Sequence, residues 1–422
     1  MGILGCKYSN KISDNTLKED KLNAPSHFIL GMDAYNKKDY AAAERELKNA
    51  IQSDSNNYLY YYQLGRVQAM QKKYSESRAS FVTSTQLNSN FEYSQFNLGF
   101  VLEKLNRSKD ALQAYRKAFA INQGYENAYL AAARILVKQN EYNEAVSLFK
   151  EAAKINPKNT KTYQEEGSAY SAAKKYKEAE ECFRKAISLL EPGTDDPVSY
   201  YNLSTVLTLQ NKNTEAVNFA KKAYETKSKA DKKLQISIVY NYAKINEDME
   251  DFDKAIPLYQ ETIKLDSKNI NARINLCKIC KSLGNVDMAI QILEPAYSIE
   301  PDNFEVNNNL GSAYMAKSDY ENAVKYFKKA SSIEPKNISV LTNLASSYAS
   351  AKEYDQAKTS YLDLIKLDKK NCDAYFELAK VCIAKKEYEA AEGYILYLQK
   401  LNADYKRDEV NALAESIKQS SF

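Results

Sequence analysis

The chain has 422 residues, of which 44% are hydrophobic and 27% charged, and its formal net charge at neutral pH is only +4. Charges of both signs are interspersed, so there is no broad basic surface for nucleic acid. No apolar run approaches the ~20 residues that cross a bilayer as a helix. With 11 Gly, 8 Pro and no Trp, the composition favours helices joined by short turns.

Residues 1–23 precede the regular pattern described below and are expected to form a disordered tether. The run Ile3-Leu4-Gly5-Cys6, followed by polar residues, resembles the cleavage box of bacterial lipoproteins, with Cys6 as the lipidated residue. The sequence lacks the charged region and the roughly 7–15-residue apolar stretch of a signal peptide, which an incorrect or truncated start would explain. Two alternatives stay open. One is myristoylation of Gly2 with acylation of Cys6, although that motif prefers Ser or Thr at position six; the other is an unmodified tail.

From Ala24 onward the sequence repeats itself with a period of 34 residues. Such self-similarity indicates a solenoid in which each repeat is one supersecondary unit. Eleven blocks align, and eight of the ten steps between their starts are 34 residues, whereas the other two are 37 and 39. The blocks begin at Ala24, Tyr58, Glu92, Glu126, Thr160, Pro197, Ile236, Ile270, Phe304, Ile338 and Cys372.

Small residues recur at two positions of every block. Position eight is Gly, Ala, Ser or Cys throughout, and position twenty is Ala in every block but one, where it is Ser77. Large, mostly aromatic residues recur at positions seventeen and twenty-four. This pattern predicts two antiparallel helices, A and B, that approach closely at the small residues and bury their other faces by stacking. Pro157, Pro301 and Pro335 at position thirty-two are expected to end helix B.

The recurring positions resemble those of the tetratricopeptide repeat family over roughly residues 24 to 403. The fifth and ninth blocks match the family pattern best. In the ninth block the matching residues are Leu310, Gly311, Tyr314, Ala323, Phe327, Ala330 and Pro335. The resemblance implies an all-α fold, a right-handed superhelical solenoid of about eleven helix-turn-helix repeats. It also implies that the A helices line a concave groove.

The sixth block departs from the pattern, because Asn213 replaces the aromatic at position seventeen and Ala220 the large residue at position twenty-four. A turn-rich segment precedes this block and a Lys-rich stretch follows it, which indicates either an irregular turn or a flexible joint. Near the end, Val410, Leu413, Ala414 and Ile417 recur at helical spacing and predict a capping helix. The predicted organisation is a tether (1–23), repeats one to five (24–196), an irregular sixth repeat and joint (197–235), repeats seven to eleven (236–404), and the capping helix with a tail (405–422).

Residues suited to catalysis or metal binding are sparse. His27 is the only histidine and falls at position four, where a packing role is expected. Cys277 and Cys280 fall at positions eight and eleven of a helix A, where buried Cys behaves as a small hydrophobe. Zinc would need two further ligands there. There is no Gly-rich phosphate loop and no disulfide framework. The sequence therefore predicts a protein that is not an enzyme and that holds no cofactor or metal.

The resemblance implies that positions two, five, six, nine, twelve and thirteen of helix A face the groove. Position six carries Asn in six blocks, and an amide can pair with the backbone of an extended peptide because it both donates and accepts hydrogen bonds. This row resembles the asparagine ladder of the O-GlcNAc transferase superhelix. Bonding of these amides to a neighbouring repeat is the alternative. The row consists of Asn97, Asn202, Asn241, Asn275, Asn309 and Asn343.

The two halves of the groove lining differ in chemistry. The N-terminal stretch is aromatic, through residues such as Phe28, Tyr62, Phe96 and Phe100, and the C-terminal stretch is more polar, with Lys244 and Lys278 beside the asparagines. Aromatic residues outside the packing positions suggest a surface that takes a partner. Packing of these rings against the next repeat is the alternative. No three consecutive repeats supply the Lys, Asn and Arg set of the chaperone-binding carboxylate clamp.

The sequence thus predicts a protein-interaction scaffold that binds an extended peptide or a helix in its groove. The alternative function is a lipid-anchored assembly or structural factor of a bacterial cell envelope, and that location is favoured over the cytoplasm. The predicted partner is a protein or peptide and not a nucleic acid. Membrane contact is predicted only through Cys6.

The lipid anchor can be tested directly. When the full native gene is expressed in the presence of a labelled fatty acid, the protein should carry the label, and Cys6→Ala should abolish labelling. Unlabelled native protein that remains in the soluble fraction would remove the envelope interpretation.

Overall fold

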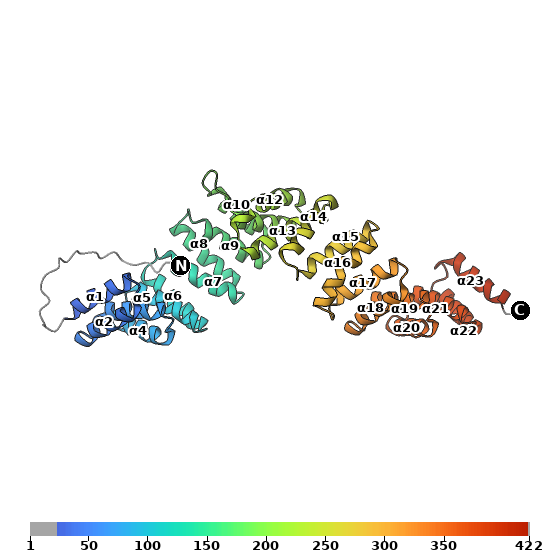
Figure 1. Cartoon of the computed structure of the whole chain (residues 1–422), viewed down its shortest axis with the longest axis horizontal. Coiled ribbons are helices and arrows are strands. Elements are labelled where there is room, and N and C mark those ends of the chain that lie inside the picture. The colour runs from blue at the N-terminus through green and yellow to red at the C-terminus, as the bar shows by residue number, and fades with distance from the viewer. Residues whose placement is uncertain (1–22, 421–422) are drawn as a thin grey trace. The chain divides into compact units, whose positions relative to one another are not determined.

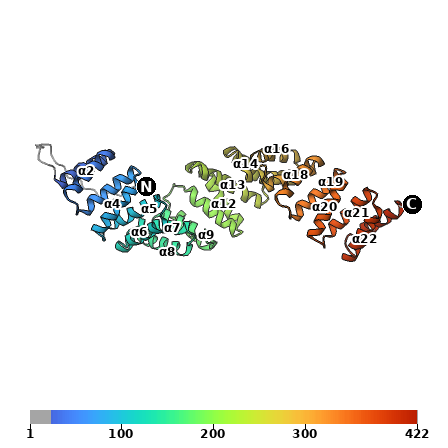
Figure 2. The same ribbon diagram turned by 90° about the horizontal axis from the view of Figure 1, so that it is seen from below.

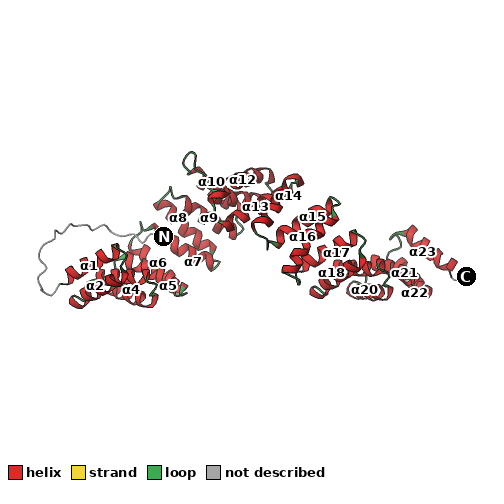
Figure 3. Cartoon of the chain, viewed as in Figure 1, coloured by secondary structure: helices red, strands yellow, loops and turns green. Residues whose placement is uncertain are grey.

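The structure is a computed structural model that describes residues 23–420. Cys6 and the rest of the predicted tether therefore lie outside the described residues. Within that range the chain forms 23 α-helices and one short 3-10 helix and contains no strand (Figure 3). None of these helices has both the length and the apolar composition of a bilayer-spanning segment.

The described residues divide into two compact units, the first ending at Thr194 and the second beginning at Asp195. The helices of the first unit are α1 (Ala24–Asn36), α2 (Tyr40–Ser53), α3 (Tyr58–Met70), α4 (Tyr74–Leu87), α5 (Glu92–Lys104), α6 (Ser108–Ile121), α7 (Glu126–Lys138), α8 (Tyr142–Ile155), α9 (Thr160–Ala172) and α10 (Tyr176–Ser188).

The second unit contains the remaining helices of the described chain. They are α11 (Pro197–Leu209), α12 (Asn213–Thr226), the 3-10 helix η1 (Lys227–Lys229), α13 (Lys232–Asp248), α14 (Phe252–Leu265), α15 (Ile270–Ser282), α16 (Val286–Ile299), α17 (Phe304–Ala316), α18 (Tyr320–Ile333), α19 (Ile338–Ser350), α20 (Tyr354–Leu367), α21 (Cys372–Ala384), α22 (Tyr388–Leu401) and α23 (Arg407–Ser420).

Odd-numbered helices from α1 to α21 are the predicted A helices, and even-numbered helices from α2 to α22 are the B helices. Each A helix packs against the B helix that follows it, and within a unit each B helix packs against the next A helix (Figures 1 and 2). The eleven helix-turn-helix repeats are therefore confirmed. One A helix starts earlier than its block: α13 begins at Lys232, one turn before Ile236, because the Asp231 side chain accepts a hydrogen bond from the Leu234 N–H.

Every A helix ends with one residue in the left-handed backbone region, always at position fifteen of its repeat. In the second repeat Lys72 has a φ of 63°. Its N–H bonds to the Ala69 carbonyl at 3.0 Å, and the Lys73 N–H bonds to the Gln68 carbonyl at 2.9 Å. This pair of bonds is the Schellman motif, which usually places Gly at the left-handed residue. Here only Gly284 does so, and the other ten repeats use Lys, Asn, Glu or Ser.

The small residue at position eight lies beneath the ring at position twenty-four. A Cβ atom added to Gly311 would come within 2.8 Å of the Phe327 ring, and the same holds for Gly65 and Phe81. Position twenty is also close, because the Ser77 hydroxyl donates to the Gly65 carbonyl oxygen at 2.7 Å. The predicted close approach of helices A and B is thus confirmed in the second repeat. There the Phe81 ring, at position twenty-four, is the side chain nearest to Gly65.

The predicted capping helix is present as α23, which packs against α21 and α22. Val410 and Ile417 are buried and join the core cluster that runs through the last repeats of the second unit. Because α23 covers the apolar face that the eleventh repeat would otherwise expose, it completes the core at the C-terminal end of the unit.

Overpacking at position eight provides a test of this account. Gly311→Val should lower the free energy of unfolding by about 1–3 kcal/mol, because the added methyl groups meet the Phe327 ring in a packed core. Gly393→Val is the matched control, since a Cβ at Gly393 has no atom within 4 Å. Urea denaturation followed by circular dichroism measures both. Equal transition midpoints for the two variants would show that position eight does not limit the helix approach.

Candidate functional site

Within each unit, neighbouring A helices contact one another as well as their B helices; α3 contacts α5 in the first unit, and α15 contacts α17 in the second. The predicted groove positions of these repeats therefore lie on adjacent helices. The burial and the hydrogen bonds of each predicted side chain then determine whether it is available to a partner.

Two of the position-six asparagines bond to their own helix. The Asn97 amide donates to the Tyr93 carbonyl at 2.8 Å, and the Asn309 amide donates to the Glu305 carbonyl at 2.8 Å. Both side chains are buried, with 8% of each residue exposed. Little of either amide is therefore presented to a ligand.

Two others bond to neighbouring side chains. The Asn241 amide donates to the Ser204 hydroxyl of the preceding repeat at 2.8 Å. The Asn275 amide donates to two hydroxyls of the preceding repeat, those of Tyr240 in α13 and Tyr259 in α14, each at 3.1 Å. These amides tie repeats together, which is the alternative role that the sequence left open.

The last two asparagines of the row differ from the others. Asn202 in α11 and Asn343 in α19 are half-buried, and neither side chain makes a hydrogen bond among the described residues. The predicted lysines differ as well: Lys244 pairs with Asp248 at 2.7 Å, whereas Lys278 is exposed and makes no ion pair within residues 23–420. Of the predicted polar groove residues, Asn202, Asn343 and Lys278 therefore keep their polar groups available.

The predicted aromatic residues of the first unit pack against neighbouring rings to different extents. Tyr62 is 95% buried, with its ring centroid 5.0 Å from that of Phe91, so it is a core residue. Phe28 lies 5.1 Å from Tyr60 and stays half-buried. Phe100 is also half-buried, with the Lys104 ammonium 5.3 Å from its ring centroid.

Phe96 belongs to a continuous group of rings at the N-terminal ends of α3, α5 and α7, here called the aromatic cluster. Phe91 contacts Tyr58 and Tyr62, each at 5.0 Å between centroids, and Tyr125 contacts Tyr93 at 5.4 Å and Phe96 at 5.1 Å. Apart from Tyr62, these rings are half-buried and so keep part of their surface open. The cluster consists of Tyr58, Tyr62, Phe91, Tyr93, Phe96 and Tyr125.

Phe91 and Tyr125 occupy helix N-cap positions. In the nine other repeats the residue before helix A is Asn or Asp, and its side-chain oxygen accepts a backbone N–H, as Asn303 does from Val306 at 3.1 Å. α5 and α7 have no such side-chain bond. An N-cap of this kind contributes about 0.5–2 kcal/mol, so the third and fourth repeats give up a stabilising contact to place rings there. This signal is present in the sequence at position thirty-four, which is not one of the groove positions that the resemblance implies.

A hollow of about 250 Å3 lies on the A-helix surface of the second unit. Its lining is polar and aromatic and includes Asn241, Tyr201, Tyr240 and the exposed amide of Asn271. Asn241, a predicted groove residue, borders this hollow, and its amide donates a hydrogen bond to Ser204. The groove surface is thus aromatic in the first unit and rich in amides at this hollow of the second.

The predicted packing residues are in the core or at its edge. Cys277 and Cys280 are at most 1% exposed, and burial raises the pKa of the Cys277 thiol to about 11. His27 is half-buried, with Nδ1 2.8 Å from Oε2 of Glu46. No group of three or more His, Cys, Asp or Glu side chains suited to a metal occurs within residues 23–420.

Tetratricopeptide repeat models match residues 30–83, 104–164, 161–229, 248–308, 304–337 and 342–405. The chain belongs to the tetratricopeptide repeat family. Repeat proteins of this kind use their stacked helices as extended binding surfaces, so this tetratricopeptide repeat protein is a protein-interaction scaffold in class. A search of curated protein sequences finds no match.

Several solved structures are similar to parts or most of this chain. The C-terminal part of a repeat protein from Cytophaga hutchinsonii has a TM-score of 0.51 and 19% identity, over 59% of this chain and 99% of that one. A repeat protein from Parabacteroides merdae has a TM-score of 0.42 and 17% identity, over 60% and 97%. Yeast Tom70 has a TM-score of 0.39 and 16% identity, over 94% and 96%. At these identities the likeness concerns the fold alone.

Substitutions in the asparagine row can distinguish an amide that stabilises the fold from an amide that is free to bind a partner. Asn275→Ala should lower the free energy of unfolding by about 0.5–1.5 kcal/mol for each lost bond, because the Tyr240 and Tyr259 hydroxyls lose a partner. Asn343→Ala, at the same position of another repeat, should change it by less than about 0.5 kcal/mol. Chemical denaturation of both variants measures the difference. Equal losses would contradict the assigned hydrogen bonds.

Proposed function

We propose that this protein is a non-enzymatic scaffold that holds an extended peptide or a helix of a partner protein along its A helices. The observation that carries the proposal is the aromatic cluster, where Phe91 and Tyr125 replace N-cap residues of consecutive repeats. Three of its rings, Tyr62, Tyr93 and Phe96, stand at predicted groove positions of the first unit, and all rings of the cluster except Tyr62 remain partly exposed.

Half-buried rings suit a binding surface for a physical reason. Aromatic side chains bury a large area with little loss of conformational freedom, and they are enriched at the centres of protein interfaces. Rings held by their neighbours, as Phe91 is by Tyr58 and Tyr62, need no rearrangement to receive a ligand. Apolar or aromatic side chains of the partner are the groups that this surface would take.

The polar groove residues of the second unit supply a second kind of contact. Asn202 and Asn343 have unused amides, and Lys278 has an unpaired ammonium on the exposed surface. An unused amide can bond to a peptide backbone whatever its side chains are. The proposal therefore assigns side-chain recognition to the aromatic cluster and sequence-independent contacts to these residues.

A peptide selection tests the proposal. Random peptides displayed on phage and selected against the full chain should share aromatic or aliphatic residues. A selected peptide should then bind Phe96→Ala and Phe91→Asn at least about tenfold more weakly, which corresponds to roughly 1.4 kcal/mol. Phe91→Asn is informative because it removes a ring and restores the N-cap residue of the other repeats. Fluorescence anisotropy gives the affinities.

The matched control is Phe119→Ala, which removes a half-buried ring from α6 of the same unit. That ring stacks on Tyr129 with centroids 4.3 Å apart and does not belong to the aromatic cluster. Phe119→Ala should bind the peptide as the wild type does, while circular dichroism confirms that all variants fold. Equal weakening in all three variants, or selected peptides without apolar side chains, would refute the aromatic surface.

The lipid-anchored role at a bacterial cell envelope is the second candidate function. It is favoured by the Ile3-Leu4-Gly5-Cys6 box, and it concerns location more than recognition, because an anchored scaffold would still bind through its helices. The labelling experiment on Cys6 decides this candidate independently of the peptide selection.

A further inference from the structure

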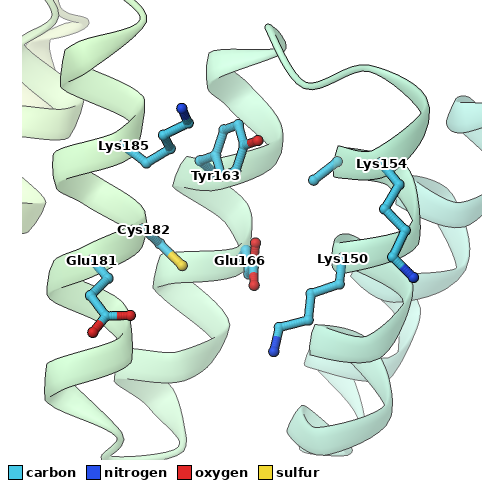
Figure 4. A pocket seen from close by; sticks show the side chains of 8 residues that line it. Lys150, Lys154, Tyr163, Glu166, Glu181, Cys182 and Lys185 are labelled. Atoms are coloured by element: carbon cyan, nitrogen blue, oxygen red, sulfur yellow. The ribbon is translucent and has the colours of Figure 1, made fainter.

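A hollow of about 400 Å3 opens among α8, α9 and α10 of the first unit, away from the predicted groove positions (Figure 4). The volume is within the range of small-ligand sites, ~300–1,000 Å3. Lys150 and Lys154 come from α8, Glu166 from α9, and Cys182 and Lys185 from α10. Side chains from three helices of two consecutive repeats therefore line one hollow, and the ammonium groups of Lys150 and Lys185 point toward opposite ends of it (Figure 4).

Glu166 is out of place for a packing residue. It stands at position seven, where eight repeats have Leu and the remaining two have Ala132 and Tyr242. It is 96% buried, and it forms no ion pair within 4 Å among the described residues. Its carboxyl group borders the hollow (Figure 4). A buried carboxyl without an ion-pair partner is costly compared with Leu, so packing does not explain this residue.

Burial raises the pKa of the Glu166 carboxyl, and the nearby Lys150 ammonium and Cys182 thiol only partly offset that effect. Burial also raises the pKa of the Cys182 thiol, with Glu166 and Glu181 acting in the same direction. The thiol is therefore protonated at neutral pH and is no nucleophile. The function that we consider for this hollow is therefore ligand binding and not covalent catalysis.

The charges around the hollow favour an anion. Lys150, Lys154 and Lys185 supply three ammonium groups, and Glu181 supplies one exposed carboxylate. The lining is thus positive by two charges when Glu166 is protonated and by one when it is ionised. Lys154 is partly neutralised by Glu151 at 2.6 Å. Lys150 lies 5.7 Å from the Tyr170 ring centroid, and Lys185 makes no ion pair among the described residues.

The donors favour carboxylate over phosphate. Phosphate sites commonly use Arg side chains or free backbone N–H groups at a helix start. The lining contains no Arg, and Glu166 and Cys182 lie within their helices, where backbone N–H groups are already bonded. We propose that this hollow binds a carboxylate group, paired with the ammonium group of Lys150 and hydrogen-bonded to the carboxyl group of Glu166. The carboxylate belongs to a small acid or to an acidic side chain of a partner.

Binding at this site takes up a proton at Glu166 when that group is ionised in the free protein. The negative charge of the ligand favours the protonated form further, so affinity is highest below the pKa of Glu166 and falls as the pH rises through it. Lys150, Tyr163 and Cys182 interact electrostatically with Glu166. The other charged groups that line the hollow are Lys154 on α8 and Glu181 and Lys185 on α10, and Tyr170 on α9 contacts Lys150.

Isothermal titration calorimetry on the full chain tests the site with three probes: succinate, a short Glu-containing peptide and inorganic phosphate. At least one carboxylate probe should bind, and its affinity should fall with rising pH. Lys150→Gln should weaken binding at least tenfold, whereas Glu166→Gln should keep binding and remove its pH dependence. Lys177→Gln, an exposed lysine of α10 outside the hollow, should change nothing. Phe96→Ala should also bind normally, which separates this site from the aromatic cluster.

Glu166→Leu completes the test, because it restores the residue that most repeats have at position seven. This variant should melt at a higher temperature than the wild type and should no longer bind the carboxylate probe. Binding of succinate would identify a small acid as sufficient, and binding of the peptide alone would assign the carboxylate to a partner chain. Absence of binding by both carboxylate probes, equally tight phosphate binding, or undiminished binding in Lys150→Gln would overturn the proposal.

Discussion

In the repeats with Gly at position eight, a large side chain at position twenty-four lies over that glycine and determines how close the two helices can be. Phe327 covers Gly311 so tightly that even one added carbon would come within 2.8 Å of the ring. Because the same contact recurs from repeat to repeat, small differences in it would accumulate along a unit. Packed interiors tolerate little change in volume, and this explains why position eight holds a small residue in every repeat.

The candidate sites lie at positions where one or two repeats carry a residue type that differs from that of most other repeats. Phe91 and Tyr125 stand where nine repeats have a capping Asn or Asp, and Glu166 stands where most repeats have Leu. Each substitution removes a local stabilising contact, and each places its side chain beside other side chains suited to binding. In a repeat protein the other repeats act as an internal reference, so such departures can be recognised without related sequences.

Much of the fold was predictable because it depends on local and periodic signals. The 34-residue period, the small residues and the apolar stripe of the last helix predicted the repeats and α23, which the structure confirms. The left-handed residue at position fifteen was not predicted, because Lys, Asn and Glu occupy it in place of Gly. The two helices that this residue joins impose its left-handed conformation, and the residue types at position fifteen do not predict it.

The sequence by itself determined the order and length of the helices, the positions that must be small, and the chemical difference between the aromatic and polar halves of the groove. Only the tertiary structure decided which of those side chains remain available. Asn275 and Asn343 occupy the same position of the repeat, yet one is bonded to two tyrosine hydroxyls and the other to none. The reason is physical: the partner of a side chain comes from another helix, and residues such as Tyr240 and Tyr259 differ between repeats where the period does not. A periodic pattern predicts the face of the helix on which a side chain lies. Whether that side chain is available to a partner depends on the residues packed against it, which do not follow the period.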